Sequence, residues 1–198
     1  MKKNIIHLVM VLLLAVPQGA LSGDAMTQQQ NLVHFSGPDQ HRWYPVNDGV
    51  MGGLSASGLT FTDQGTGLFA GELSLENNGG FASVRTVIGP VDLSNHAGLE
   101  IKVRGDGRTY QLRLRLNDRF DGISYRAFFE TQADQWTSIR VPFSEFQPTF
   151  RGRILDEAPA LDTSAIQQLA FMLADKQPGP FALEIGSVMT WNSDKLGP

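Results

Sequence analysis

One stretch of the sequence decides the fold: Tyr110-Gln111-Leu112-Arg113-Leu114-Arg115-Leu116. Apolar and polar residues alternate through it without a break. Successive side chains of a β-strand point to opposite faces, so the tyrosine and the leucines share one face and the glutamine and the arginines share the other. A helix, with its period of 3.6 residues, cannot separate this pattern. The stretch therefore predicts a half-buried strand with a polar face that carries Arg113 and Arg115.

Other runs of the chain carry the same strand signal. Residues 99–104 alternate too, and the segment Gly105-Asp106-Gly107-Arg108 that follows tolerates positive φ, so we expect a hairpin with the run at 110–116. A second hairpin is expected between residues 69–75 and 81–88, because Asn77-Asn78-Gly79-Gly80 suits a type I′ turn. Further strands are predicted at residues 59–62, 124–130, 136–141, 169–174 and 181–188, and a short helical stretch at 162–167.

These strands define the fold class. With 21 glycines and 10 prolines marking frequent turns, they predict an all-β protein, an antiparallel β-sandwich of the jelly-roll type.

Composition argues against several functional classes. The 198 residues include 16 basic and 20 acidic ones, a net charge of −4, which disfavours nucleic-acid binding. The chain has no cysteine, so disulfides, thiolate nucleophiles and cysteine-based zinc sites are excluded. The glycine clusters lack the Lys-Ser/Thr of a phosphate loop, and no serine has a nucleophile-elbow setting. Residues 117–122 could offer oxygen ligands to calcium, but a polar loop is the preferred interpretation. We therefore expect no metal, no cofactor and no enzymatic activity.

The N-terminal residues resemble a cleaved export signal. Two lysines precede an apolar run at residues 5–16, and small residues follow it up to about residue 22. The run is shorter than the roughly 20 apolar residues that span a bilayer, and no cysteine is present to carry a lipid, so no stable membrane anchor is expected. This predicts a signal peptide at 1–22, an exported protein that is periplasmic or secreted, a flexible lead-in at 23–40 and one domain at 41–193.

Two glycine-rich polar segments, residues 46–55 and 77–85, contain the first candidate binding residues. Segments of this kind, set between strands, are where proteins place recognition surfaces. Asn77 and Asn78 are equally explained as turn residues. Arg85 lies on an otherwise alternating strand, so it either pairs with Asp48 and ties the two segments together, which is the favoured interpretation, or contacts a partner.

The arginines of the polar strand face are the second candidate. Arg104, Arg126 and Arg140 are expected to join Arg113 and Arg115 from neighbouring strands. A solvated sheet face is the simpler explanation, because exposed ion pairs contribute only about 0–1 kcal/mol each. On a concave face, however, guanidinium groups beside aromatic rings could stack on and hydrogen-bond a ligand. The complete set of candidate binding residues is Asn47, Asp48, Asn77, Asn78, Arg85, Asp106, Arg108, Arg113, Arg115 and Trp136.

From about Trp43 to Trp191 the chain resembles the complex I intermediate-associated protein 30 family, a β-sandwich group related to galactose-binding-like domains. The resemblance is carried by residues 46–55, 77–85, 104–110, 136, 141–143 and 174–181. It implies a non-enzymatic assembly factor, since mitochondrial members help to assemble the membrane arm of respiratory complex I. A protein partner in an envelope or respiratory complex is therefore expected, with the working surface near Asn47, Asp48, Arg85 and the turn at 105–108.

A carbohydrate-binding domain of the galactose-binding-like type is the alternative. In that case aromatic rings would stack on sugars while arginine, asparagine and aspartate bind hydroxyl groups. This alternative predicts exposed aromatic residues on a concave face, and it is weakened if Tyr110, Tyr125 and Trp136 all prove to be buried.

Overall fold

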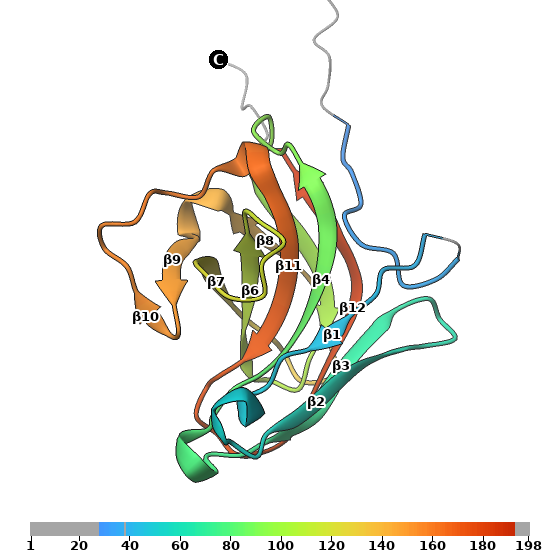
Figure 1. Cartoon of the computed structure of the whole chain (residues 1–198). Helices are drawn as coiled ribbons and strands as arrows, with labels where there is room; N and C mark the ends of the chain where they lie inside the picture. The colour runs from blue at the N-terminus through green and yellow to red at the C-terminus, as the bar shows by residue number, and fades with distance from the viewer. Residues whose placement is uncertain (1–27, 38, 193–198) are drawn as a thin grey trace, which may run out of the picture.

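Two antiparallel β-sheets pack face to face in the computed structural model, which describes residues 28–37 and 39–192 (Figure 1). This confirms the predicted all-β sandwich. The predicted signal peptide lies outside the described residues. Within the ranges that the structure describes, no helix is long and apolar enough to cross a membrane.

The larger sheet has seven strands and the smaller has five. The order of the larger one is β1 (Tyr44–Pro45), β4 (Ala82–Val91), β11 (Ile166–Leu173), β6 (Thr109–Arg115), β7 (Ser124–Glu130), β9 (Gln147–Phe150) and β10 (Arg153–Ile154). The order of the smaller one is β2 (Ala56–Phe61), β3 (Gly67–Leu73), β12 (Gly179–Trp191), β5 (Gly98–Arg104) and β8 (Trp136–Pro142). Four short 3₁₀ helices connect strands: η1 (Asp48–Met51), η2 (Glu76–Asn78), η3 (Phe143–Glu145) and η4 (Thr163–Ala165).

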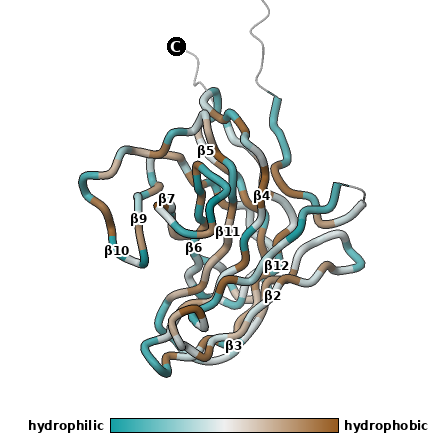
Figure 2. Tube along the Cα trace, viewed as in Figure 1, coloured by the Kyte–Doolittle hydropathy of each residue, from teal (hydrophilic) through white to brown (hydrophobic). Residues whose placement is uncertain are grey.

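Strand β6 shows why the sequence folds this way. Tyr110, Leu112 and Leu114 are fully buried between the sheets, whereas Arg113 and Arg115 lie on the opposite face. Burying one face of each strand removes apolar area from water at about 25 cal/mol per Å², which is the main favourable term in folding. Hydrophilic and hydrophobic colours alternate along the strands in Figure 2 for the same reason.

The core also includes residues that the sequence assigned to the lead-in. Leu32, Val33 and Phe35 are buried against the sandwich. The backbone N–H of Leu32 donates a hydrogen bond of 2.8 Å to the carbonyl of Val188. The packed part of the chain therefore begins before residue 41.

Both predicted hairpins are wrong. Strand β5 pairs with β12 and β8, and β6 pairs with β11 and β7, so residues 105–108 cross from one sheet to the other. Strands β3 and β4 likewise belong to different sheets. Asn77 and Asn78 do have the positive φ of a type I′ turn, 54° and 58°, but residues 74–81 are too long a connection for a two-residue turn. Alternation assigns a face to each strand without choosing its neighbour.

Candidate functional site

The two glycine-rich segments meet at the buried carboxylate of Asp48. Its oxygens accept hydrogen bonds from the backbone N–H of Ser55 at 2.9 Å, of Gly80 at 2.6 Å and of Phe81 at 3.3 Å, and from the Ser55 hydroxyl at 2.5 Å. Burial raises the pKa of Asp48, but the hydrogen bonds from Ser55, Gly80 and Phe81 outweigh it and leave the pKa below its ordinary value. We call this arrangement the Asp48 hub.

The glycines of both segments are required by the hub. A Cβ added at Gly53 would lie 2.4 Å from the Asp48 Cγ, and one at Gly79 would lie 2.5 Å from Oδ2. Asn47 and Asn77 complete the connection: the Asn47 Oδ1 accepts from the Ser83 N–H at 3.1 Å, and the Asn77 Nδ2 donates to the Gly52 carbonyl at 3.2 Å. These residues hold the two segments together.

The favoured ion pair between Arg85 and Asp48 does not form. The Arg85 Nη1 donates to the backbone carbonyl of Phe120 at 2.9 Å, and its guanidinium lies 5.4 Å from the Phe120 ring centroid. Instead, the Asp48 carboxylate accepts hydrogen bonds from Ser55 and from the backbone N–H groups of Gly80 and Phe81. Asn78 is exposed and has the left-handed backbone expected of a turn residue.

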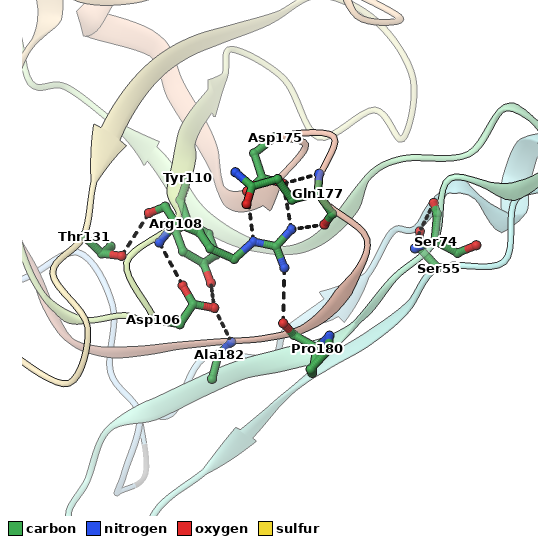
Figure 3. A network of polar contacts seen from close by, with 10 residues as sticks. All are labelled: Ser55, Ser74, Asp106, Arg108, Tyr110, Thr131, Asp175, Gln177, Pro180 and Ala182. Carbon is green, nitrogen blue, oxygen red and sulfur yellow. Dashed lines mark hydrogen bonds and ion pairs between the residues drawn. The ribbon is translucent and has the colours of Figure 1, made fainter.

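Asp106 and Arg108 also serve the fold (Figure 3). The Arg108 guanidinium makes a bidentate pair with Asp175, with Nε–Oδ2 at 2.9 Å and Nη2–Oδ1 at 2.7 Å, and both side chains are largely buried. Asp106 accepts from the Tyr110 hydroxyl at 3.0 Å and from the Ala182 N–H at 2.9 Å. The pair anchors the crossover at 105–108 to the loop between β11 and β12. Asp175 was absent from the predicted site residues, because nothing in the sequence indicates its partner.

The arginines on the outer face of the seven-stranded sheet form a different kind of site. Arg85, Ala170, Arg113 and Arg126 are direct cross-strand neighbours in one row over β4, β11, β6 and β7. Arg115 lies on the same face of β6, two residues after Arg113. These side chains border a cavity of about 630 Å³ that is closed at its sides by the loops around residues 46–51, 120–122 and 151–152. We call it the arginine groove and define its floor as Arg85, Arg113, Arg115 and Arg126.

Among the described residues, no carboxylate forms an ion pair with these floor arginines, and Asp121 at the edge of the groove offsets only part of the charge of Arg85 and Arg115. Arg113 donates to Gln111 at 3.0 Å and to the Ser124 hydroxyl at 3.1 Å, and Arg115 donates to the Gly122 carbonyl at 3.1 Å. The Nε of Arg126 is buried without a hydrogen-bond partner.

The crowded charges perturb one another. Burial, and then the charges of Arg126, Arg115 and Arg85, lower the pKa of Arg113 to about 10. Burial and the charge of Arg115 lower the pKa of Arg85 to about 10, against a smaller opposing effect of Asp121. Such a surplus of like charge destabilises the empty groove and favours the approach of an anion.

The other predicted members lie elsewhere. Arg104 and Arg140 are on β5 and β8 of the five-stranded sheet, where they pair with Glu184 and Glu100. Trp136 is on β8 as well, 39% exposed and within 5.4 Å of the Arg104 guanidinium. The other two rings proposed for stacking on sugars, Tyr110 and Tyr125, are buried in the core. Within the part of the chain that the structure describes, Tyr110, Tyr125 and Trp136 therefore do not form the predicted stacking platform in the groove.

The apolar rim of the groove was missed by the sequence reading. Val50 and Met51 on η1 are 65% and 60% exposed, and Phe120 in the loop between β6 and β7 is 66% exposed. All three residues line the groove. Large apolar side chains held open to water beside a charged floor are typical of an interaction surface. For Val50 and Met51, the sequence signal of an exposed surface was their position in a glycine-rich loop, next to residues that the fold needs.

Comparison with known proteins places this arrangement in a family. Residues 33–185 match the family model described as complex I intermediate-associated protein 30. A mitochondrial protein of that name from Drosophila melanogaster is 29% identical over 177 residues, which cover 78% of this chain and 60% of the relative. The mouse protein of that name is 29% identical over 167 residues, 74% of this chain and 51% of the relative. The chain thus spans between about half and 60% of the length of these relatives.

Two further similarities extend the comparison. An uncharacterized protein of Schizosaccharomyces pombe is 32% identical over 182 residues, 79% of this chain and 82% of that protein. Among solved structures, a family 11 carbohydrate-binding module from Clostridium thermocellum in complex with a mixed-linked tetrasaccharide superposes with a TM-score of 0.59. It covers 83% of this chain and 95% of the module at 16% identity, which shows the fold alone.

These comparisons correct one prediction and confirm another. The named relatives are described as mitochondrial, so the prediction of a periplasmic or secreted protein is wrong. The family resemblance is confirmed over most of the chain, in sequence and in fold. The chain belongs to the complex I intermediate-associated protein 30 family.

Proposed function

We propose that the protein is a non-catalytic binding module that engages a protein partner through the arginine groove and its apolar rim, and that it acts in the assembly of a respiratory complex. The observation that carries the proposal is the row of Arg85, Arg113 and Arg126, none of which forms an ion pair with a carboxylate of the described residues, bordered by exposed Val50 and Phe120. Charged groups at a protein interface steer encounter and fix orientation, while apolar groups supply affinity. Family membership supplies the class of partner.

The Asp48 hub supports this role indirectly. It fixes the backbone on both sides of η1, so Val50 and Met51 are presented from a rigid loop. A preorganised contact loses less conformational entropy on binding than a flexible one. The glycine-rich segments therefore act through the surface that they position.

Site-specific crosslinking tests the proposal. A photoreactive phenylalanine analogue would replace Phe120 in the groove, and in a control protein it would replace Ser138, which is exposed on β8 of the other sheet. After irradiation in the organism of origin, we expect adducts with subunits or assembly intermediates of a respiratory complex from position 120 and not from position 138. The same adducts from both positions, or none from position 120, would contradict the proposal.

A further inference from the structure

The arginine groove concentrates positive charge in a chain that is acidic overall. Six cationic side chains and one carboxylate are among its described lining residues, whereas the whole chain has a net charge of −4. The one carboxylate, Asp121, pairs at 3.0 Å with Arg151 at an exposed position. A cleft of one sign, walled by protein, focuses its field and attracts ligands of the opposite sign.

The guanidinium groups of the floor are held in place by hydrogen bonds to uncharged acceptors, which leave their positive charge in place. Each guanidinium has five N–H donors, and Arg85 and Arg115 each use one of them on a backbone carbonyl. These neutral acceptors fix the direction of the side chains and leave their charge and other donors to a ligand. The Nε of Arg126 is buried and makes no hydrogen bond within the protein. A guanidinium held in place binds a carboxylate more effectively than a flexible one.

The spacing of the row suits several separate anionic groups. Arg113 and Arg126 are on adjacent strands, about 5 Å apart, and Arg85 lies two strands from Arg113, about 10 Å away. Ala170 lies between Arg85 and Arg113, so the floor has room for a ligand there. Same-face side chains of an extended peptide are about 7 Å apart, a distance that guanidinium side chains in this row can accommodate.

We propose that the arginine groove binds an extended acidic segment of the protein partner, whose aspartate or glutamate carboxylates pair with Arg85, Arg113 and Arg126 while its apolar side chains contact Met51 and Phe120. The inference rests on the function proposed above and specifies the ligand.

The groove favours a peptide over other anions. A single phosphate needs donors that converge on one point, whereas these arginines are distributed along a row. The apolar rim, with side chains from η1 and from the loop between β6 and β7, matches a chain with both apolar and acidic side chains. Nucleic acid would meet an acidic molecule outside the groove, and an anionic membrane is flat where this site is recessed between loops.

Peptide binding tests the inference directly. Fluorescence polarisation of a labelled twelve-residue peptide with alternating glutamate and apolar residues would be compared with the same peptide carrying glutamine. We expect the glutamate peptide to bind at least about tenfold more tightly, because glutamine cannot make the charge-assisted hydrogen bonds that a carboxylate makes with a guanidinium group. Ala170→Phe, which fills the floor without changing its charge, is expected to weaken binding about tenfold, and Lys102→Gln on the other sheet less than twofold. Equal affinity for both peptides, or no binding of either at about 1 mM, would overturn the inference.

A second set of probes separates the possible failures. Inorganic phosphate or phosphatidylglycerol vesicles that bind the groove, when the glutamate peptide does not, would overturn the acidic segment as the ligand. Groove-specific crosslinks from position 120 would then still support the proposed function. Failure of those crosslinks would remove the proposed function itself, whatever the peptide result.

Discussion

Replacing Arg126 by glutamine should leave the protein as stable as before or make it more stable, although it removes a half-buried charged side chain. Arg126 lies directly opposite Arg113, and like charges in direct cross-strand positions destabilise a sheet. Its Nε has no hydrogen-bond partner, and its guanidinium lies 5.0 Å from the Phe128 ring centroid. The substitution therefore removes a repulsion at the loss of one aromatic contact.

The magnitude follows from the pKa of Arg113. Its fall from the ordinary arginine value to about 10 corresponds to about 3 kcal/mol against the folded state at pH 7. Burial is the largest cause and three arginines share the rest, so relief from removing Arg126 is on the order of 1 kcal/mol. Loss of the exposed cation–π contact costs about 0.5–1 kcal/mol. The net expectation is a change between about 0 and 0.5 kcal/mol in favour of folding.

The sign of the pH dependence follows from the same comparison. A base whose pKa is lower in the folded state opposes folding wherever it is protonated, so the penalty is complete below about pH 10 and is relieved as the pH rises above that value. Measurements at pH 7 therefore report the full effect.

Urea unfolding at pH 7 measures this change, with Lys102→Gln on β5 as a control for loss of one exposed positive charge. Arg126→Gln should match or exceed the wild-type free energy of unfolding. A loss of more than about 1 kcal/mol, with the control unchanged, would show that Arg126 is a structural residue and would refute the reasoning.

Three further predictions concern the supporting structure. Gly53→Ala should lower the free energy of unfolding by about 2–4 kcal/mol through its clash with the buried Asp48, whereas Gly49→Ala, with open space around it, should change it by less than about 0.5 kcal/mol; a small effect at both positions in chemical denaturation would contradict the hub. Arg108→Lys should cost about 2–3 kcal/mol in the same measurement, because lysine cannot reproduce the bidentate pair with Asp175, and an unchanged value would show that the pair is dispensable. Asp48 has a lowered pKa in the folded state, so its contribution to the free energy of unfolding is complete above the unfolded-state value near 3.8 and is lost as the pH falls through the lower folded value. In acid titrations followed by fluorescence, Asp48→Asn should be less stable than the wild type at neutral pH and should lose less stability in this pH range. Parallel curves for the two proteins would contradict this assignment.

The alternation at residues 110–116 was sufficient to predict the face of each side chain on β6, and together with the other strand runs and the frequent turns it predicted the β-sandwich. It could not predict the neighbours of that strand, because period-2 patterning is satisfied equally by a hairpin and by a crossover between sheets. Gly105 and Gly107 correctly predicted a turn after β5. The turn connects β5 to a strand of the other sheet and does not close a hairpin.

Prediction of the site was limited in a similar way. Arg113 and Arg115 were assigned to one face correctly, whereas Arg104 follows the same alternation on β5 and lies on the other sheet. Asp48 and Arg85 have opposite charges and lie in the two glycine-rich segments, which favoured an ion pair between them. In the structure Asp48 binds backbone N–H groups, and Arg85 binds the carbonyl of Phe120. Buried carboxylates are stabilised equally well by N–H groups or by a cation, so residue type does not distinguish them. The location was predicted from basic and apolar residues near the N-terminus, a pattern that receptors read and that the fold does not depend on. This pattern led to the wrong compartment.

The central claim is that the arginine groove, and not the opposite sheet, binds the partner. The most direct test is the dissociation constant of the partner identified by crosslinking, measured for the wild type, Arg126→Gln and Lys102→Gln. Our account predicts about tenfold weaker binding for Arg126→Gln, because one charge-assisted contact is lost, and less than a twofold change for Lys102→Gln. Equal affinity of Arg126→Gln and wild type, with both fully folded, would contradict it.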